Sequence, residues 1–354
     1  MAKRKRLFKR PLKTEKLKVN YVALYLGILT IIGTILLGKV YIESQKTESK
    51  VTVLFLGFDC KECILPTFDM NFKFENKSIP YKDSDEYIEK YNISKLPAII
   101  VYGDFVKDYF QLLNESGLRK IDEKTYVIET TSVPFMDAKS KVVRGLINAV
   151  EIYDENCSEC FNFSSFIENL KARSIKIVNY TRIDYRKTPL TKEYNISLIP
   201  TLFLSEDAYF YKNLLEFWIN IGSFEKSGLL TRTTYPPFLN LSSKEYVGFV
   251  ELIEIKVNSC PECFNVTRLE SALRNRVKFR NITTYDYSEK KAKELIKKYN
   301  ISFAPTILLS KDIYYYGFED LDYFGELRGE YWVFTKIIQN ETFLNLSTYK
   351  YFHG

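Results

Sequence analysis

Apolar runs alternate with polar, helix-like stretches in the same order three times along the chain. In the second copy, an apolar strand at 150–153 is followed by a cysteine pair, a helical stretch, a second strand and a short helix. That copy ends at the motif Tyr-Asn-Ile-Ser-Leu-Ile-Pro, residues 194–200, and the apolar strand 201–204. Strands that alternate with helices predict an α/β fold.

The repeating unit is about 100 residues long. Its first cysteines stand at positions 60, 157 and 260, spacings of 97 and 103 residues. The closing motif recurs at 91–97 and 299–305, each time followed by another apolar strand. Units of this length are whole domains and not solenoid repeats. We therefore expect three α/β domains, at 51–138, 145–240 and 248–350.

An uncharged segment precedes the repeats. It covers 20 residues, 19–38, between Lys18 and Lys39, which is about the length that a helix needs to cross a bilayer. A cleaved signal peptide is the alternative, but the run is long for one and no small-residue cleavage site follows. We expect a transmembrane helix at 19–41, after a basic cytoplasmic tail at 1–18 and before a tether at 42–50, with the domains on the extracytoplasmic side.

The net charge of +7 does not change this picture. Residues 1–18 carry a net +8, so the rest of the chain carries a net −1 and offers no basic surface for nucleic acid. The single histidine, His353, lies in the C-terminal tail. Its position nearly excludes Cys–His or Ser–His catalysis and a His-ligated metal site.

Thirteen asparagines are followed by a non-proline residue and then Ser or Thr, which is the acceptor motif for N-glycosylation. They are Asn76, Asn92, Asn114, Asn156, Asn162, Asn179, Asn195, Asn240, Asn265, Asn281, Asn300, Asn340 and Asn345. This density predicts an exported glycoprotein. Asn92, Asn195 and Asn300 recur at one helix end, where asparagine also suits a left-handed cap, and both interpretations stay open. Asn156, beside Cys157, is the least expected acceptor.

All six cysteines fall into Cys-x-x-Cys pairs, Cys60/Cys63, Cys157/Cys160 and Cys260/Cys263. In a pair that starts a helix, the two cysteines share a face within reach of a disulfide. The helix dipole stabilises the first thiolate, which attacks a substrate disulfide before the second cysteine resolves the mixed disulfide. A disulfide that closes so short a loop removes little conformational entropy from the unfolded chain. Three such pairs are therefore better explained by redox chemistry than by stabilisation of the fold.

These features resemble the thioredoxin superfamily, in particular multidomain thiol–disulfide oxidoreductases of the protein disulfide isomerase type, over about residues 51–350. The resemblance implies three tandem thioredoxin-like domains, each with a central mixed sheet flanked by helices. It also implies that Pro97, Pro200 and Pro305 are cis prolines that face the cysteine pairs and leave the adjacent backbone open to substrate.

The resemblance implies, in addition, a buried acid six residues before the first cysteine, which transfers the proton of the resolving thiol. Glu151 and Glu254 hold this position, and burial of a carboxylate favours its protonated form. An exposed glutamate on an alternating strand is the other interpretation. The first repeat has Leu54 there, so we expect that repeat to react slowly or to serve in binding.

Three functions stay open at this stage. The first is an anchored enzyme that forms, reduces or rearranges disulfides in exported proteins, with no cofactor and with an unidentified redox partner. The second is a scaffold with permanently oxidised pairs that binds unfolded or partner proteins. The third is zinc binding, which we do not expect because each pair lies in its own domain without a nearby histidine. No retrieval signal ends the chain, which favours a cell-surface membrane over the endoplasmic reticulum lumen.

Overall fold

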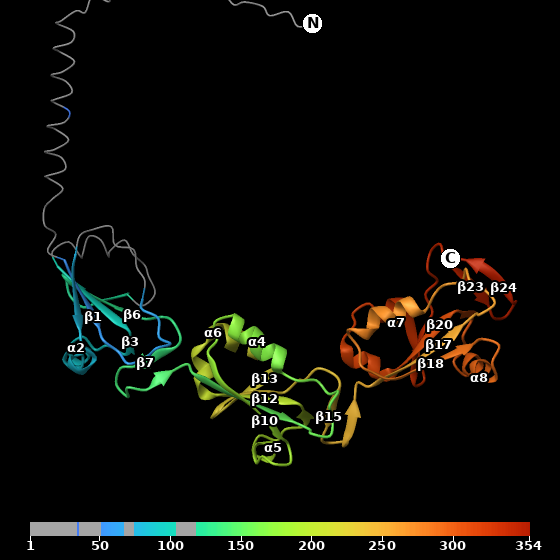
Figure 1. Ribbon diagram of the computed structural model, residues 1–354, viewed down its shortest axis with the longest axis horizontal. Coiled ribbons are helices and arrows are strands. Elements are labelled where there is room, and N and C mark those ends of the chain that lie inside the picture. The colour runs from blue at the N-terminus through green and yellow to red at the C-terminus, as the bar shows by residue number, and fades with distance from the viewer. Residues whose placement is uncertain (1–33, 35–50, 67–73, 104–117) are drawn as a thin grey trace, which may run out of the picture. The chain divides into compact units, whose positions relative to one another are not determined.

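The computed structural model describes Thr34 and residues 51–66, 74–103 and 118–354 (Figure 1). The predicted basic tail, the tether and all of the predicted transmembrane segment except Thr34 lie outside these residues, as does Asn114. Among the described residues, no helix combines the length and the apolar character needed to cross a bilayer.

The chain divides into two compact units. In the first unit, the described residues are 51–58, 65–66, 74–93, 97–103 and 118–131, and they form one five-stranded sheet with the helix α2 (Asp85–Lys90). The second unit comprises 59–64, 94–96 and 132–354, and it holds two further five-stranded sheets and three small sheets of three strands.

All three five-stranded sheets share one topology. The first has the order β2 (Glu75–Ile79), β1 (Thr52–Leu56), β4 (Ala98–Tyr102), β6 (Thr125–Glu129), β5 (Leu118–Lys120). The second has the order β10 (Ile177–Asp184), β9 (Ile147–Tyr153), β12 (Thr201–Ser205), β14 (Gly228–Thr231), β13 (Gly222–Glu225). The third has the order β18 (Phe279–Asp286), β17 (Val250–Lys256), β20 (Thr306–Ser310), β22 (Tyr331–Phe334), β21 (Gly325–Arg328).

In each sheet the first two strands are parallel and the remaining neighbours are antiparallel. A parallel pair needs a crossover connection, and the cysteine pair lies in that crossover. The three similar mixed sheets confirm the predicted α/β repeat and are consistent with tandem thioredoxin-like domains. The exact domain limits stay a prediction.

Helices pack on these sheets through short apolar stripes. In α4 (Ser164–Ala172) the stripe consists of Ile167 and Leu170, which are buried one turn apart against Ile147 and Leu202 of the sheet. The remaining helices are α5 (Leu190–Glu193), α6 (Lys212–Trp218), α7 (Thr267–Arg274), α8 (Lys290–Lys298), α9 (Leu321–Phe324) and the 3-10 turns η1 (Tyr81–Asp83), η2 (Glu206–Phe210) and η3 (Lys311–Tyr316).

Each repeat adds a hairpin that the apolar pattern did not predict. The hairpins are β7 (Phe135–Asp137) with β8 (Val143–Arg144), β15 (Phe238–Asn240) with β16 (Glu245–Val247), and β23 (Thr342–Asn345) with β24 (Lys350–His353). Each pairs with a two-residue strand just before the motif proline: β3 (Lys95–Leu96), β11 (Leu198–Ile199) or β19 (Phe303–Ala304). We call these three hairpins the straps.

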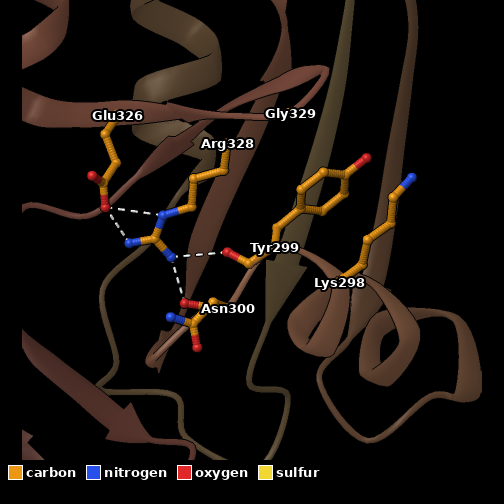
Figure 2. A pocket seen from close by; sticks show the side chains of 6 residues that line it. All are labelled: Lys298, Tyr299, Asn300, Glu326, Arg328 and Gly329. Atoms are coloured by element: carbon orange, nitrogen blue, oxygen red, sulfur yellow. Dashed lines mark hydrogen bonds and ion pairs between the residues drawn. The ribbon is translucent and has the colours of Figure 1, made fainter.

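An arginine clamps the helix end before each motif proline. Figure 2 shows Arg328, which donates to the carbonyl oxygens of Tyr299, at 2.9 Å, and Asn300, and also pairs with Glu326. Arg119 and Arg232 bind the corresponding carbonyl oxygens in the other repeats. Such contacts satisfy carbonyls that a helix terminus leaves unpaired.

The asparagines at these helix ends have left-handed backbones, with φ of 47° at Asn92, 50° at Asn195 and 48° at Asn300. Asparagine tolerates this region better than most residues. The cap interpretation of the repeated Tyr-Asn-Ile-Ser motif is therefore confirmed. The pocket of Figure 2 is lined by this clamp, so we assign its residues a structural role.

Candidate redox-active sites

Every cysteine pair forms a disulfide. The Cα atoms are 5.5 Å apart in Cys60–Cys63, 5.4 Å apart in the second pair and 5.3 Å apart in the third. These separations lie in the usual range for disulfides. Within the described residues, no group of three or more His, Cys, Asp or Glu side chains is arranged to hold a metal ion.

The three disulfides differ in exposure. Those of the first and second repeats are half-buried. Cys260 and Cys263 are only 5% and 8% exposed, and they pack in an apolar cluster with Leu295 and Ala304. A reductant that must touch a sulfur atom therefore reaches the second disulfide more easily than the third.

The cysteine pairs of the second and third repeats do not begin a helix, so that expectation was wrong. Cys157 to Cys160 lie in turns, and α4 begins only at Ser164; α7 likewise begins four residues after Cys263. The influence of a helix dipole falls off within the first turn, so it stabilises these thiolates less than expected.

In both repeats, the backbone directly after the second cysteine is bonded to the strap or to the residue just before it. The backbone N–H of Phe161, directly after Cys160, donates to the carbonyl oxygen of Pro237 at 2.9 Å. Phe264, directly after Cys263, donates in the same way to Thr342 at 2.9 Å.

Glu151 is fully buried, as expected for a proton-transfer acid, but its charge is balanced. Its carboxylate accepts a hydrogen bond from the N–H of Phe163 at 3.3 Å and pairs with Arg182 at 3.1 Å. The hydroxyl of Tyr180 donates to the same group. Burial raises the pKa of Tyr180 to about 12, with a further contribution from this hydrogen bond, so the phenol remains a donor.

Glu254 is also buried, at 1% exposure, but it is less completely paired. One oxygen, Oε2, accepts from Thr284 at 2.9 Å and lies 2.9 Å from Lys256. The other, Oε1, is buried and has no partner among the described residues. This oxygen therefore keeps its acceptor capacity unused.

Leu54 stands at the corresponding position of the first repeat and is buried, opposite Lys77 on β2 and Ile100 on β4. No carboxylate replaces the missing acid in this register. The expectation that the first repeat differs from the other two in its chemistry stays a prediction.

The motif prolines differ among the repeats. The Ile199–Pro200 and Ala304–Pro305 bonds are cis, whereas Leu96–Pro97 is not among the cis bonds of the described residues. The implication of a cis bond at Pro97 was therefore wrong. The trans form is the intrinsic preference of X–Pro bonds by roughly 0.5–1 kcal/mol.

The backbone before each proline pairs on one side with the strap and forms the edge of a small three-stranded sheet, so the expectation of backbone groups open to substrate stays a prediction. Leu198 and Ile199 pair with Asn240 and Leu239 of the strap, and the same pairing recurs at β3 and β19. These strap residues lie about 40 positions downstream, so the local sequence pattern around the proline does not reveal the pairing.

In the second repeat, a charged network fixes the segment before the cysteines. Asp154 accepts from the hydroxyl of Tyr246 on the strap at 2.6 Å and from the backbone N–H of Asn156 at 3.0 Å. Arg186 joins Asp154 to Asp184, and its hydrogen bond to Asp184 holds the pKa of that carboxyl well below its usual range. The strap thus binds the chain on both sides of the Cys157–Cys160 disulfide.

In the third repeat the strap also contacts the segment before the cysteines, but the hydrogen bond is longer than in the second repeat. Ser259, next to Cys260, lies 3.3 Å from the hydroxyl of Tyr351. No charge assists this contact. Local patterns in the sequence do not predict the roles of Tyr246, Tyr351, Asp154 and Arg186. The two tyrosines stand 86 and 88 residues after the second cysteine of their repeats, and this similar spacing is the signal that could have pointed to them.

Comparison with known proteins adds little. No protein-family model and no curated protein matches the chain. Among solved structures, full-length ERdj5 is similar at 8% sequence identity and a TM-score of 0.17, over 75% of this chain and 41% of that one. Human ERp44 in its zinc-bound form is similar at 12% identity and a TM-score of 0.14, over 74% of this chain and 78% of that one. The chain thus spans about two fifths of the length of ERdj5.

Proposed function

We propose that this chain is a membrane-anchored thiol–disulfide oxidoreductase that acts on exported proteins through its Cys-x-x-Cys disulfides. The observation that carries the proposal is that two repeats each contain such a disulfide together with a buried glutamate six residues before its first cysteine. Burial of a carboxylate costs several kcal/mol, so a function is the best reason to keep two.

In the proposed reaction, the thiolate of one cysteine attacks a substrate disulfide and forms a mixed disulfide. The second cysteine, deprotonated by the buried glutamate, then attacks the bonded cysteine, which closes the Cys-x-x-Cys disulfide and releases the reduced substrate. The reverse sequence oxidises a substrate dithiol. Both acids have a cationic partner, Lys256 for Glu254 and Arg182 for Glu151. We assign the proton transfer of the third repeat to Oε1 of Glu254, which has no partner among the described residues.

The second candidate function is a scaffold whose disulfides never open. Two observations favour it: the burial of Cys260 and Cys263, and the pairing of every motif-proline strand with a strap. Both would slow the exchange of thiols. In this reading the straps and disulfides together stabilise domains that bind other proteins.

Thiol trapping separates the two functions. Residues 45–354 are equilibrated in glutathione and dithiothreitol buffers of graded potential, the free thiols are alkylated, and each pair is quantified by peptide mass spectrometry. Potentials between about −120 and −270 mV support the enzyme. Disulfides that stay closed below about −300 mV support the scaffold.

The membrane topology that we propose rests on the uncharged segment 19–38 and the basic residues before it. Protease added to intact cells tests it. Digestion of the repeats with protection of the N-terminal tail is the expected result, and protection of the repeats would contradict the proposed location.

A further inference from the structure

Three of the potential glycosylation sites lie on the end strands of the three large sheets. Asn76 lies on β2, Asn179 on β10 and Asn281 on β18, and each of these strands is the first in its sheet order. All three asparagines are exposed. Asn179 and Asn281 also occupy corresponding positions on their strands. Each is the first residue after an irregularity in the pairing of its strand with the neighbouring one.

Two of these end strands, β10 and β18, are unusually long, whereas β2 has 5 residues. Both β10 and β18 have 8 residues, more than any other strand in the described part of the chain, whereas β13 and β21 at the opposite ends have 4 each. An end strand leaves a row of N–H and C=O groups unpaired, which another chain can use for edge-to-edge pairing. The short opposite strands limit that risk, and the long ones need another protection.

The side-chain amides of these three asparagines make no hydrogen bond within the described residues. Four other sites differ, because the Oδ1 atoms of Asn162, Asn240, Asn265 and Asn345 each accept from the backbone N–H two residues further on. Those amides are held in turns, and Asn240 and Asn345 are half-buried. The end-strand amides are exposed and are not held in such turns.

The end-strand sites also lie away from the disulfides. Asn179 pairs with Asn148 near the start of β9, whereas Cys157 follows the end of that strand. Five residues of strand separate these ends, about 16 Å at roughly 3.3 Å per residue. Asn281, opposite Glu251 at the start of β17, is placed in the same way. A sugar at either site leaves the cysteine end of the sheet open.

We propose that Asn76, Asn179 and Asn281 carry N-linked oligosaccharides that cover the free edges of the sheets and prevent edge-to-edge association. In the reaction, the amide nitrogen bonds to C1 of the sugar of a lipid-phosphate-linked oligosaccharide donor. The bond between C1 and the phosphate oxygen breaks, the lipid phosphate leaves with the electron pair, and the amide loses one proton. This inference rests on the proposed extracytoplasmic location.

Glycopeptide mass spectrometry on the full chain, purified from its own membrane, tests the modification. We expect high occupancy at the three end-strand sites and none at Asn156. Occupancy at other sites without Asn179 and Asn281 would overturn the inference but support the proposed location. A chain without any glycan would overturn both.

Two double variants test the purpose of the glycans. Thr181→Val with Thr283→Val removes the acceptor motifs of Asn179 and Asn281, leaves that of Asn76 in place and keeps β-branched residues on β10 and β18. Ser197→Ala with Ser302→Ala removes the motifs at the helix ends and serves as the matched control. By light scattering after size exclusion, we expect the first variant to associate at concentrations at least tenfold below the control. Equal association of the two variants would refute the edge-covering role.

Discussion

The hydrogen bond between Tyr246 and Asp154 offers a direct test of whether the straps control access to the disulfides. Tyr246→Phe removes one hydroxyl that links the strap to the segment before Cys157, at 2.6 Å from a buried carboxylate. That carboxylate keeps its bonds to Asn156 and Arg186, so the change acts mainly on the strap.

The size of the effect follows from the geometry. Hydrogen bonds to charged groups contribute about 1.5–3 kcal/mol. Tyr246 is 36% exposed, and water replaces part of the lost bond, so we take about 1–1.5 kcal/mol. Since 1.4 kcal/mol is a factor of ten, the strap of the second repeat should open about 5- to 12-fold more often.

The matched control is Tyr351→Phe in the third repeat. Its hydroxyl contacts the neutral Ser259 at 3.3 Å, and the side chain is 48% exposed. Such a bond contributes less than about 0.5 kcal/mol. We therefore expect the third strap to open at most about twice as often.

The assay is the rate of reduction of each disulfide by dithiothreitol, followed by rapid alkylation and peptide mass spectrometry. We expect Tyr246→Phe to speed reduction of Cys157–Cys160 about 5- to 12-fold and to leave Cys260–Cys263 unchanged. An unchanged rate at Cys157–Cys160, or the same increase in both variants, would refute the idea that the straps gate the disulfides.

Three further predictions concern the buried acids and the clamps. Arg232→Met should lower the free energy of unfolding by about 1–2 kcal/mol, because the carbonyl oxygen of Tyr194 loses its donor; a urea titration that matches the unaltered chain would contradict this. The depressed pKa of Asp184 means that its ionised form stabilises the fold above about pH 4 and that this contribution disappears as the pH falls. Asp184→Asn should therefore be less stable at pH 6, and its stability should fall less between pH 5 and 2; parallel pH profiles would refute the assignment. Glu254→Gln should slow closure of the third disulfide at pH 7 at least 10-fold with little change in thermal stability, whereas equal rates would exclude proton transfer by this residue.

Much of the arrangement could be predicted from local pattern. The three cysteine pairs, the repeated motif and the alternation of apolar strands with helices are short-range features, and the three similar sheets follow from them. The burial of Glu151 and Glu254 agrees with what the resemblance implied, whereas strand alternation by itself left an exposed glutamate equally open.

Other features depended on residues far apart in the chain. Leu198 pairs with Asn240, and Tyr246 reaches back to Asp154, 92 residues earlier. Nothing near the cysteines shows that the N–H directly after the second cysteine bonds to a segment far along the chain, or that α4 begins only at Ser164.

The sequence by itself determined that this protein repeats one α/β unit with a Cys-x-x-Cys pair and, in two copies, an acid in the register of a buried strand. The tertiary structure alone decided how accessible those cysteines are. The reason is physical: strand and helix periodicity is set by neighbouring residues, whereas each strap pairs through backbone groups that every residue carries, so only the folded chain selects its partner.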